Sequence, residues 1–412
     1  MKAYSTLRYV LIALVVLSLA GLLWWYLLLK QRGEAIEVGN TGRGAGLSQP
    51  FGAPTGSTYE NIISSLTTLV VGDQTNGNSP SRLAQIGKTP TAGFGFVGSA
   101  STTRVRLVER GTGYVFDVDP VSGSLKRVTN TLIPRTYEAL VANSGRVVLR
   151  GLNEQDVVVT IAGEMMTSTS TSQNPVALSQ KQLSNNIRSM DVRPDGGEVF
   201  YIADSSIGAV GIRAAWDGSK EATAASLTTS GWQIHWGSND RLVLVQNAAD
   251  NVSGNAYSVE ADGVLTPIVR GVLGLTLAPD PHSPAILYGQ SAGTLSLFAR
   301  IDDSSAPVAL PIRTVADKCA WAPAQTDGPR VAYCAVPQTA PPADFLDRWY
   351  RGEVHTRDVW WRVEVNTGVV ELLYSPDSTI IDVEDPVIDA GGNYIAFRNA
   401  IDKSLWLLRI SK

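Results

Sequence analysis

Residues 191–204 read "DVRPDGGEVFYIAD", two short stretches of strand-forming residues on either side of a Pro-Asp-Gly-Gly turn. Glycine supplies the positive φ that a tight hairpin turn needs, and Val, Phe, Tyr and Ile favour extended chain. The stretch therefore predicts a β-hairpin. A single hairpin does not define a fold, but a hairpin that recurs along the chain indicates a repeat architecture.

The pattern recurs five more times, each time as an apolar strand, a turn of Gly, Asp, Asn or Pro, and a second β-rich strand. The recurrences are "ALVANSGRVVLRG" (139–151), "WQIHWGSNDRLVLVQ" (232–246), "GLTLAPDPHSPAILYG" (274–289), "CAWAPAQTDGPRVAYCAV" (319–336) and "PVIDAGGNYIAFRN" (386–399). A second hairpin type alternates with the first, at 114–129, 210–225, 256–269, 297–310 and 361–374. Turns of the first type are separated by 51, 44, 41, 47 and 64 residues, close to the length of a four-stranded propeller blade.

Six such units, together with the segment 92–129, predict an all-β fold, a seven-bladed β-propeller over residues 81–412. The last unit ends after a third strand, in "SLWLLRISK", whereas "SRLAQIG" (81–87) resembles a fourth strand without a blade. We expect this N-terminal strand to complete the last blade and close the ring, which removes an exposed sheet edge. A β-sandwich array or a right-handed β-helix fits less well, because their repeats are irregular or much shorter.

The blocks "RPDGGEVFYIAD", "WAPAQTDGPRVAY" and "IDAGGNYIAF" resemble the W-S-P-D-G-x-x-I-A-F repeat of TolB-like and related WD40-like β-propellers. The resemblance covers residues 81–412 and implies the fold rather than an activity. TolB itself carries an additional α/β domain, for which this chain has no room. Residues 289–293, "GQSAG", match the Gly-x-Ser-x-Gly elbow of the hydrolases that accompany some of these propellers, but they join two predicted strands and lack the strand-to-helix turn that the elbow needs.

The N-terminal region predicts a single membrane anchor. Residues 9–29, "YVLIALVVLSLAGLLWWYLLL", contain no charge, and as a helix they would span about 31 Å, a typical hydrocarbon thickness. A cleaved signal peptide has a shorter apolar region and lacks the Trp-Trp-Tyr belt that ends this one. Residues 1–8 are then a cytoplasmic N-terminus and residues 30–80 a flexible linker rich in Gly, Ser and Thr. Within the linker, "NIISSLTTLVVGDQ" (61–74) is apolar enough to dock, as a helix or a strand.

Composition restricts the chemistry that the chain can perform. A net charge of −4 with 17% charged residues provides no basic field for nucleic acid. Three histidines, His235, His282 and His355, lie in different blades without metal-ligand spacing, so neither a metal nor another cofactor is expected. We expect His235 to be a strand residue with a satisfied hydrogen bond, and His282 and His355 to be solvated.

The two cysteines, Cys319 and Cys334, fall on the first two strands of the sixth blade. If the turn centres near residues 325–326, they lie almost opposite each other and can form a disulfide, the alternative being two buried thiols. A disulfide suits an oxidising compartment, so it places the propeller on the extracytoplasmic side of the membrane. Charges flanking the predicted anchor are balanced and do not decide its orientation.

The repeat is broken once, by "PQTAPPADFLDRWYRGEVHTR" (337–357), between the second and third strands of the sixth blade. This insertion contributes five candidate partner-binding residues of types common at interface hot spots, Phe345, Arg348, Trp349, Tyr350 and Arg351. The alternative is that Phe345, Leu346 and Trp349 pack down over the ring as a structural plug. Without a catalytic motif in the structural context that it requires, we expect no enzyme but a protein-interaction or scaffold module in the cell envelope. A ligand-binding or hydrolytic propeller that uses the central channel is the alternative.

Overall fold

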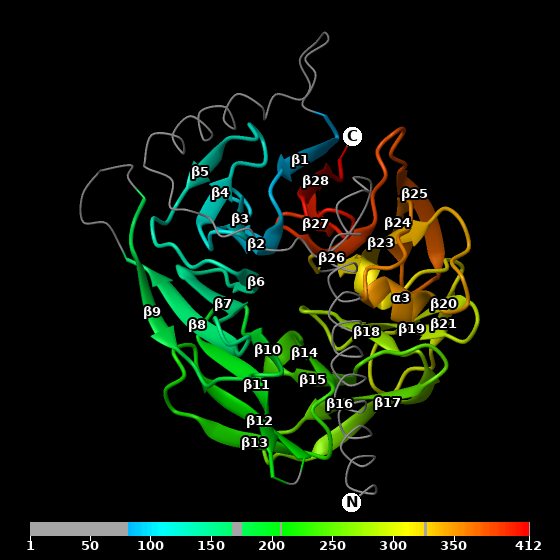
Figure 1. Cartoon of the computed structure of the whole chain (residues 1–412). Helices are drawn as coiled ribbons and strands as arrows, with labels where there is room; N and C mark the ends of the chain where they lie inside the picture. The colour runs from blue at the N-terminus through cyan, green and yellow to red at the C-terminus, as the bar shows by residue number, and fades with distance from the viewer. Residues whose placement is uncertain (1–80, 167–174, 207, 325–327, 412) are drawn as a thin grey trace, which may run out of the picture. The chain divides into compact units, whose positions relative to one another are not determined.

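The computed structural model describes residues 81–411, apart from 167–174, 207 and 325–327. These residues form seven four-stranded antiparallel sheets arranged as the blades of a ring (Figure 1). The predicted seven-bladed β-propeller is confirmed. The predicted N-terminus, anchor and linker, residues 1–80, lie outside the described residues. Within the described part, every helix is too short to cross a membrane.

Each blade consists of four strands, from an innermost to an outermost one. Blades 1 to 4 are β2 (Thr91–Val97), β3 (Arg104–Glu109), β4 (Val115–Val118), β5 (Leu125–Arg127); β6 (Thr136–Val141), β7 (Arg146–Leu152), β8 (Val158–Met165), β9 (Leu178–Gln182); β10 (Ser189–Val192), β11 (Glu198–Ser205), β12 (Gly208–Ala215), β13 (Ala222–Leu227); and β14 (Trp232–Trp236), β15 (Leu242–Gln246), β16 (Ser253–Val259), β17 (Leu265–Leu273). Blades 5 to 7 are β18 (Thr276–Pro279), β19 (Ile286–Ser291), β20 (Leu295–Arg300), β21 (Val308–Leu310); β22 (Cys319–Trp321), β23 (Val331–Pro337), β24 (Asp358–Glu364), β25 (Val369–Tyr374); and β26 (Val383–Ile388), β27 (Tyr394–Asn399), β28 (Leu405–Arg409), β1 (Leu83–Gly87). Three short helices complete the described elements, η1 (Ser238–Asp240), η2 (Ala316–Lys318) and α3 (Phe345–Tyr350).

The strand order gives the ring two distinct faces. Links between successive blades, and connections between the second and third strands of a blade, leave on the same side, which we call the upper face. Connections between the first and second strands, and between the third and fourth, lie on the opposite, lower face. The helices η2 and α3 therefore both belong to the upper face.

The second strand of the opening hairpin, β11, explains how the blades hold together. Val199 and Tyr201 join an apolar cluster with blade 2, whereas Phe200 and Ile202 join one with blade 4. All four side chains are fully buried, because the strand is covered on both faces, and a continuous apolar run results. Each such side chain contributes about 1.5–3 kcal/mol by leaving water. Equivalent clusters lie between all seven pairs of neighbouring blades.

Glycine is needed at two kinds of position. Gly196, in the turn of the opening hairpin, has φ +72°, and the Asp195 carboxylate accepts a hydrogen bond from the Gly197 N–H. The acidic residue and paired glycines are thus turn chemistry. Gly93, on β2, lies so close to blade 2 that a Cβ there would stand 1.8 Å from the Ala139 carbonyl oxygen. Its missing side chain allows the inner strands of blades 1 and 2 to approach.

The N-terminal strand closes the ring as expected. β1 pairs with β28 in antiparallel register from Leu83↔Leu408 to Gly87↔Leu405. The Arg82 guanidinium adds hydrogen bonds to the carbonyls of Arg409 (3.2 Å) and Ile410 (3.1 Å). The last blade is therefore built from both ends of the described chain.

We predict that Ile86→Ala destabilises the protein by about 2–4 kcal/mol, because Ile86 is buried between blades 7 and 1 against Val105 and Leu405. Gln85→Ala, on the half-buried side of the same strand, should cost less than about 1 kcal/mol. Urea unfolding of the two variants measures the difference. Equal destabilisation by both would contradict a closing role for the packing of β1.

Candidate functional site

The insertion between β23 and β24 carries α3, the only α-helix among the described residues. Its inner side consists of Phe345, Leu346 and Trp349, which are all buried. They pack against Leu295 of blade 5 and Val315 of the link into blade 6. The insertion thus folds down onto the upper face, and these three side chains act as the structural plug weighed from the sequence.

Reciprocal hydrogen bonds fix the helix to blade 4. The Asp250 N–H donates to Asp347 Oδ1 (3.1 Å), and the Asp347 N–H donates to Asp250 Oδ2 (3.0 Å). Ser291 of blade 5 donates its hydroxyl to the same Asp250 carboxylate. A helix of six residues has little stability by itself, so these contacts and the apolar packing determine its position.

A buried charged network underlies the helix and joins blade 6 to blade 7. Lys318, Asp358 and Asp382 have side chains that are 0% exposed. Lys318 Nζ lies 2.7 Å from Asp358 Oδ2, also contacts Asp382, and donates to Thr356 Oγ1 (2.7 Å). Burial opposes ionisation of Asp382, but the charge of Lys318 and hydrogen bonds to Lys318, His355 and Thr356 hold its pKa below the usual value. The carboxylate therefore stays charged and paired.

The insertion supplies two further contacts to this network. Trp349 Nε1 donates to the Asp382 carboxylate (3.0 Å), and the Lys318 ammonium lies 4.8 Å from the centroid of the Trp349 ring. His355 Nδ1 is 2.8 Å from Asp382 Oδ2, and its side chain is 13% exposed. The expectation that His355 is solvated is wrong, because the insertion folds back and buries it against the network.

The five candidate partner-binding residues separate into two groups. Phe345 and Trp349 point into the ring and are 1% and 7% exposed, so neither is available to a partner. Arg348, Tyr350 and Arg351 remain accessible, with exposed side chains on the upper face. Arg351 Nε pairs with Glu353 at 2.7 Å, and Tyr350 donates its hydroxyl to Asp317.

Acidic side chains gather around the centre of the ring beside Tyr350. Glu138 and Asp385 lie on innermost strands, and Asp317 lies in η2. Burial raises the pKa of Asp317 to about 6, with a smaller contribution from the negative charge of Asp385. The pKa of Asp385 is also raised, by burial and by Glu384 and Glu138, against the opposing charges of Arg398 and Lys403. The Asp385 side chain is 59% exposed, and its Oδ2 lies 2.5 Å from Arg398 Nη2.

Asp191, from the opening hairpin, extends this acidic lining to blade 3. Burial raises its pKa to about 6, although the N–H groups of Val192 and Trp236 donate to its carboxylate at 2.8 and 2.9 Å. The charge of Glu138 adds to the increase. The arrangement can attract cationic groups, but no set of three His, Cys, Asp or Glu residues in the described chain could hold a metal ion.

The other two histidines behave differently from each other. His282 is exposed in its turn, as expected. His235 lies on β14, but its Nε2 has no hydrogen-bond partner among the described residues, so the expected satisfied bond is wrong. Burial lowers the pKa of His235 to about 4, and the imidazole is neutral near pH 7.

The two cysteines pair directly in the register of β22 and β23, and the structure joins Cys319 to Cys334 in a disulfide. Lys318 precedes this disulfide, so the buried network and the covalent link share one corner of blade 6. Sequence reasoning missed Lys318, Asp358 and Asp382. One local signal could have pointed to Lys318: in "VADKCAW" this lysine stands between an apolar link and a buried strand, where a charged side chain needs a buried partner of opposite charge.

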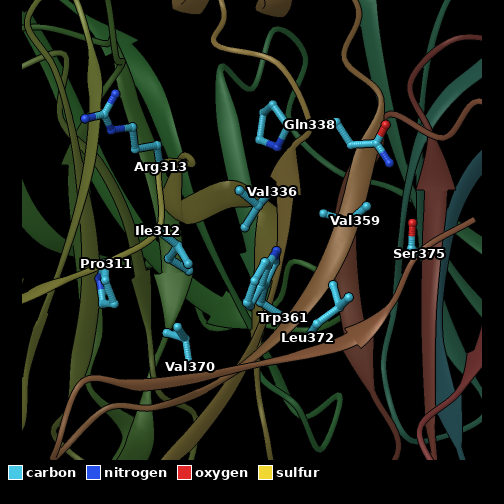
Figure 2. A pocket seen from close by; sticks show the side chains of 11 residues that line it. Pro311, Ile312, Arg313, Val336, Gln338, Val359, Trp361, Val370, Leu372 and Ser375 are labelled. Atoms are coloured by element: carbon cyan, nitrogen blue, oxygen red, sulfur yellow. The ribbon is translucent and has the colours of Figure 1, made fainter.

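An apolar pocket of about 430 Å³ lies between blades 5 and 6. Figure 2 shows Trp361 standing between Ile312 on one side and Leu372 on the other. Arg313 and Gln338 stand at its edge (Figure 2). The pocket is not part of the buried network and does not contain the candidate residues of the insertion.

The fold defines this protein as a seven-bladed β-propeller, and the resemblance to TolB-like propellers holds at that level. No family model matches the chain, and no curated protein matches it. Among solved structures, the chain is similar to the tricorn protease, with 10% identity and a TM-score of 0.48, over 82% of this chain and 35% of that one. It is also similar to an oligogalacturonate lyase from Vibrio parahaemolyticus, with 7% identity and a TM-score of 0.49, over 80% and 94% of the two chains. This chain thus spans about a third of the tricorn protease chain.

We predict that Asp317→Asn changes how stability depends on pH. A carboxyl whose pKa is raised to about 6 stabilises the fold fully below pH 4, and that contribution is lost as the pH rises through 6. The amide still accepts the Tyr350 hydrogen bond but does not ionise. Relative to wild type, the variant should therefore gain about 1–2 kcal/mol between pH 4.5 and 7.5.

Urea unfolding at several pH values measures this difference. Asp302→Asn is the matched control, because hydroxyl and N–H groups of Ser304 and Ser305 lower the pKa of Asp302 to about 2. Because the pKa is about 2 in the folded state and 3.8 in the unfolded state, its titration is nearly complete by pH 5, so this variant should not alter the pH profile above pH 5. A flat difference between wild type and Asp317→Asn would contradict the raised pKa of Asp317.

Proposed function

We propose that the chain is a membrane-anchored interaction module whose upper face binds a protein partner outside the cytoplasm. Residues 9–29 supply the anchor and residues 30–80 the tether. The observation that carries the proposal is the distribution of exposed large apolar side chains. Among the eleven such side chains in the described part of the chain, six lie on the upper face, three on the lower face and two on the outer strand of blade 6. The upper-face residues are Leu132, Tyr137, Val252, Tyr350, Ile380 and Ile401.

The insertion places aromatic and basic groups at the centre of this face. Tyr350 is 41% exposed, and it stands between Arg348 and Arg351 on a helix that buried contacts hold in one position. Tyr and Arg contribute most at interfaces when they are already ordered, because less side-chain entropy is lost on binding. The exposed side of α3 thus suits the centre of a docking surface.

The mixed character of the surface favours a protein over a polyanion. Arg348 lies near Asp344 and Glu353, and Arg351 pairs with Glu353, so the exposed arginines stand among carboxylates. Asp317 of the acidic group accepts a hydrogen bond from Tyr350 of the same helix. A partner with both signs of charge around an apolar centre fits this surface, as in ordinary protein–protein interfaces.

The expected outcome for the triple variant Arg348→Ala, Tyr350→Ala, Arg351→Ala is about a tenfold loss of partner crosslinks in native membranes, quantified by mass spectrometry. The matched control replaces three lower-face side chains of similar exposure, Val121, Met166 and Val264, by alanine. Point variants are preferable to deleting 338–356, because the deletion also removes Trp349 and His355 from the buried network. If the folded triple variant crosslinks to the same partners as wild type, the proposal that α3 forms the docking surface is contradicted.

Whether the propeller lies outside the cytoplasm can be tested by measuring whether Cys319 and Cys334 are oxidised. We predict that the protein, taken from native membranes and denatured without reductant, exposes no reactive thiol, because an oxidising exterior preserves the link between Cys319 and Cys334. Alkylation before and after reduction, followed by mass spectrometry, counts the thiols. Two reactive thiols before reduction would argue against both the disulfide and the extracytoplasmic location.

A further inference from the structure

The pocket between blades 5 and 6 continues onto an exposed apolar strand edge. Val370 and Leu372 of β25 both line the pocket; in Figure 2, Val370 stands beside Ile312, and Leu372 lies on the other side of Trp361. Val369 and Leu372 are 55% and 51% exposed. Of the seven outer strands in the described chain, only β25 exposes two large apolar side chains.

Such an edge favours association unless something covers it. An outermost strand has unpaired backbone N–H and C=O groups along one side, and apolar side chains make that side adhesive. Most of the other outer strands are short or polar, as in "LKR" for β5 and "LSQKQ" for β9. Leu372 is both exposed and part of the pocket lining with Ile312, Val336 and Trp361, so the pocket continues onto the exposed face of β25 at this residue, whereas Val369 lies on the opposite face of the strand.

The described chain begins close to this surface. The Arg82 guanidinium lies 5.4 Å from the centroid of the Tyr374 ring, at the end of β25, and the next residue, Ser375, lines the pocket. Nine residues, 72–80, separate Val71 from Ser81, and they can extend over about 30 Å. Neighbouring sheets are only about 10 Å apart. The segment before residue 72 can therefore reach the pocket of its own chain.

That segment has the chemistry to fill the pocket. Residues 63–71 read "ISSLTTLVV", and Ile63, Leu66 and Val70 recur at helical spacing with no charge among them. Asp73 follows two residues later. At the edge of the pocket, Arg313 is exposed and makes no hydrogen bond or ion pair within the described chain. An apolar face followed by an acid matches an apolar pocket with a free arginine at its edge.

We propose that residues 63–71 dock in the pocket between blades 5 and 6 of their own chain, with Asp73 paired to Arg313. The short connection gives the segment an effective concentration in the millimolar range, so even a weak contact is largely occupied. Docking covers the apolar edge of β25. It also shortens the free tether between the proposed anchor and the propeller from 51 residues (30–80) to 33 (30–62). The contact does not depend on the partner surface proposed above.

Engineered cysteines test the contact in the full chain. Leu66→Cys combined with Leu372→Cys should form an intrachain disulfide about tenfold faster than Leu66→Cys combined with Val264→Cys, because docking raises the effective concentration. Val264 is as exposed as Leu372 but lies on blade 4. Equal rates for the two pairs would overturn the proposal. So would crosslinks that form only between differently tagged copies, since the segment would then dock on a second molecule.

A second readout uses surface variants that leave the core intact. Leu372→Asp should increase chymotryptic cleavage within residues 63–71 by about tenfold, because the apolar contact is lost, whereas Val264→Asp should not change it. Arg313→Glu should also increase cleavage, and adding Asp73→Arg should restore protection. If cleavage is as fast in wild type as in Leu372→Asp, or if the charge exchange restores nothing, the docked state is refuted.

Discussion

The antiparallel pairing of β1 with β28 is the constraint on which the ring depends. Six blades are continuous in sequence, but the seventh takes three strands from the end of the described chain and one from its beginning. Leu83 and Ile86 on that one strand contribute to apolar clusters on both sides of blade 7. If β1 separates, β28 becomes an unpaired edge strand, and the interfaces of blade 7 with blades 6 and 1 each lose a buried side chain. Closure therefore makes the stability of every blade depend on its neighbours, and on a strand encoded about 320 residues away.

A second long-range junction fixes the insertion. Lys318, Asp358 and Asp382 come from the link into blade 6, the start of β24 and the link into blade 7. A fully buried ammonium between two carboxylates is costly unless each group is paired and hydrogen-bonded. Thr356, Trp349 and His355 supply those bonds, and all three belong to the insertion or its end. Asp358 Oδ1 stays buried without a partner among the described residues, but the Trp349 bond to Asp382 forms only when α3 is in place, so burial of the Asp382 carboxylate and docking of the helix are coupled.

The sequence predicted the features that depend on neighbouring residues, and it missed those that depend on residues far apart in the chain. The hairpin in 191–204 and its repeats are local patterns, and they led to the seven blades, the closing strand and the register of the cysteines. The buried network is not local, because its members lie 40 and 64 residues from Lys318 and follow no motif. Residue type alone also misjudged the insertion. Trp349 and Arg351 are both common at interfaces, but only the fold shows that one is buried and the other exposed.

The two interpretations of the insertion are compatible because they concern opposite sides of one helix. Phe345, Leu346 and Trp349 hold α3 against the ring, and this fixes the direction in which Arg348, Tyr350 and Arg351 point. Tyr350 is further restrained by its hydrogen bond to Asp317, whose carboxyl has a pKa raised by burial. A six-residue helix without this foundation would present the same side chains in many arrangements. The break in the repeat is therefore better ordered than its composition indicates, and the plug is what makes the exposed side suitable for recognition.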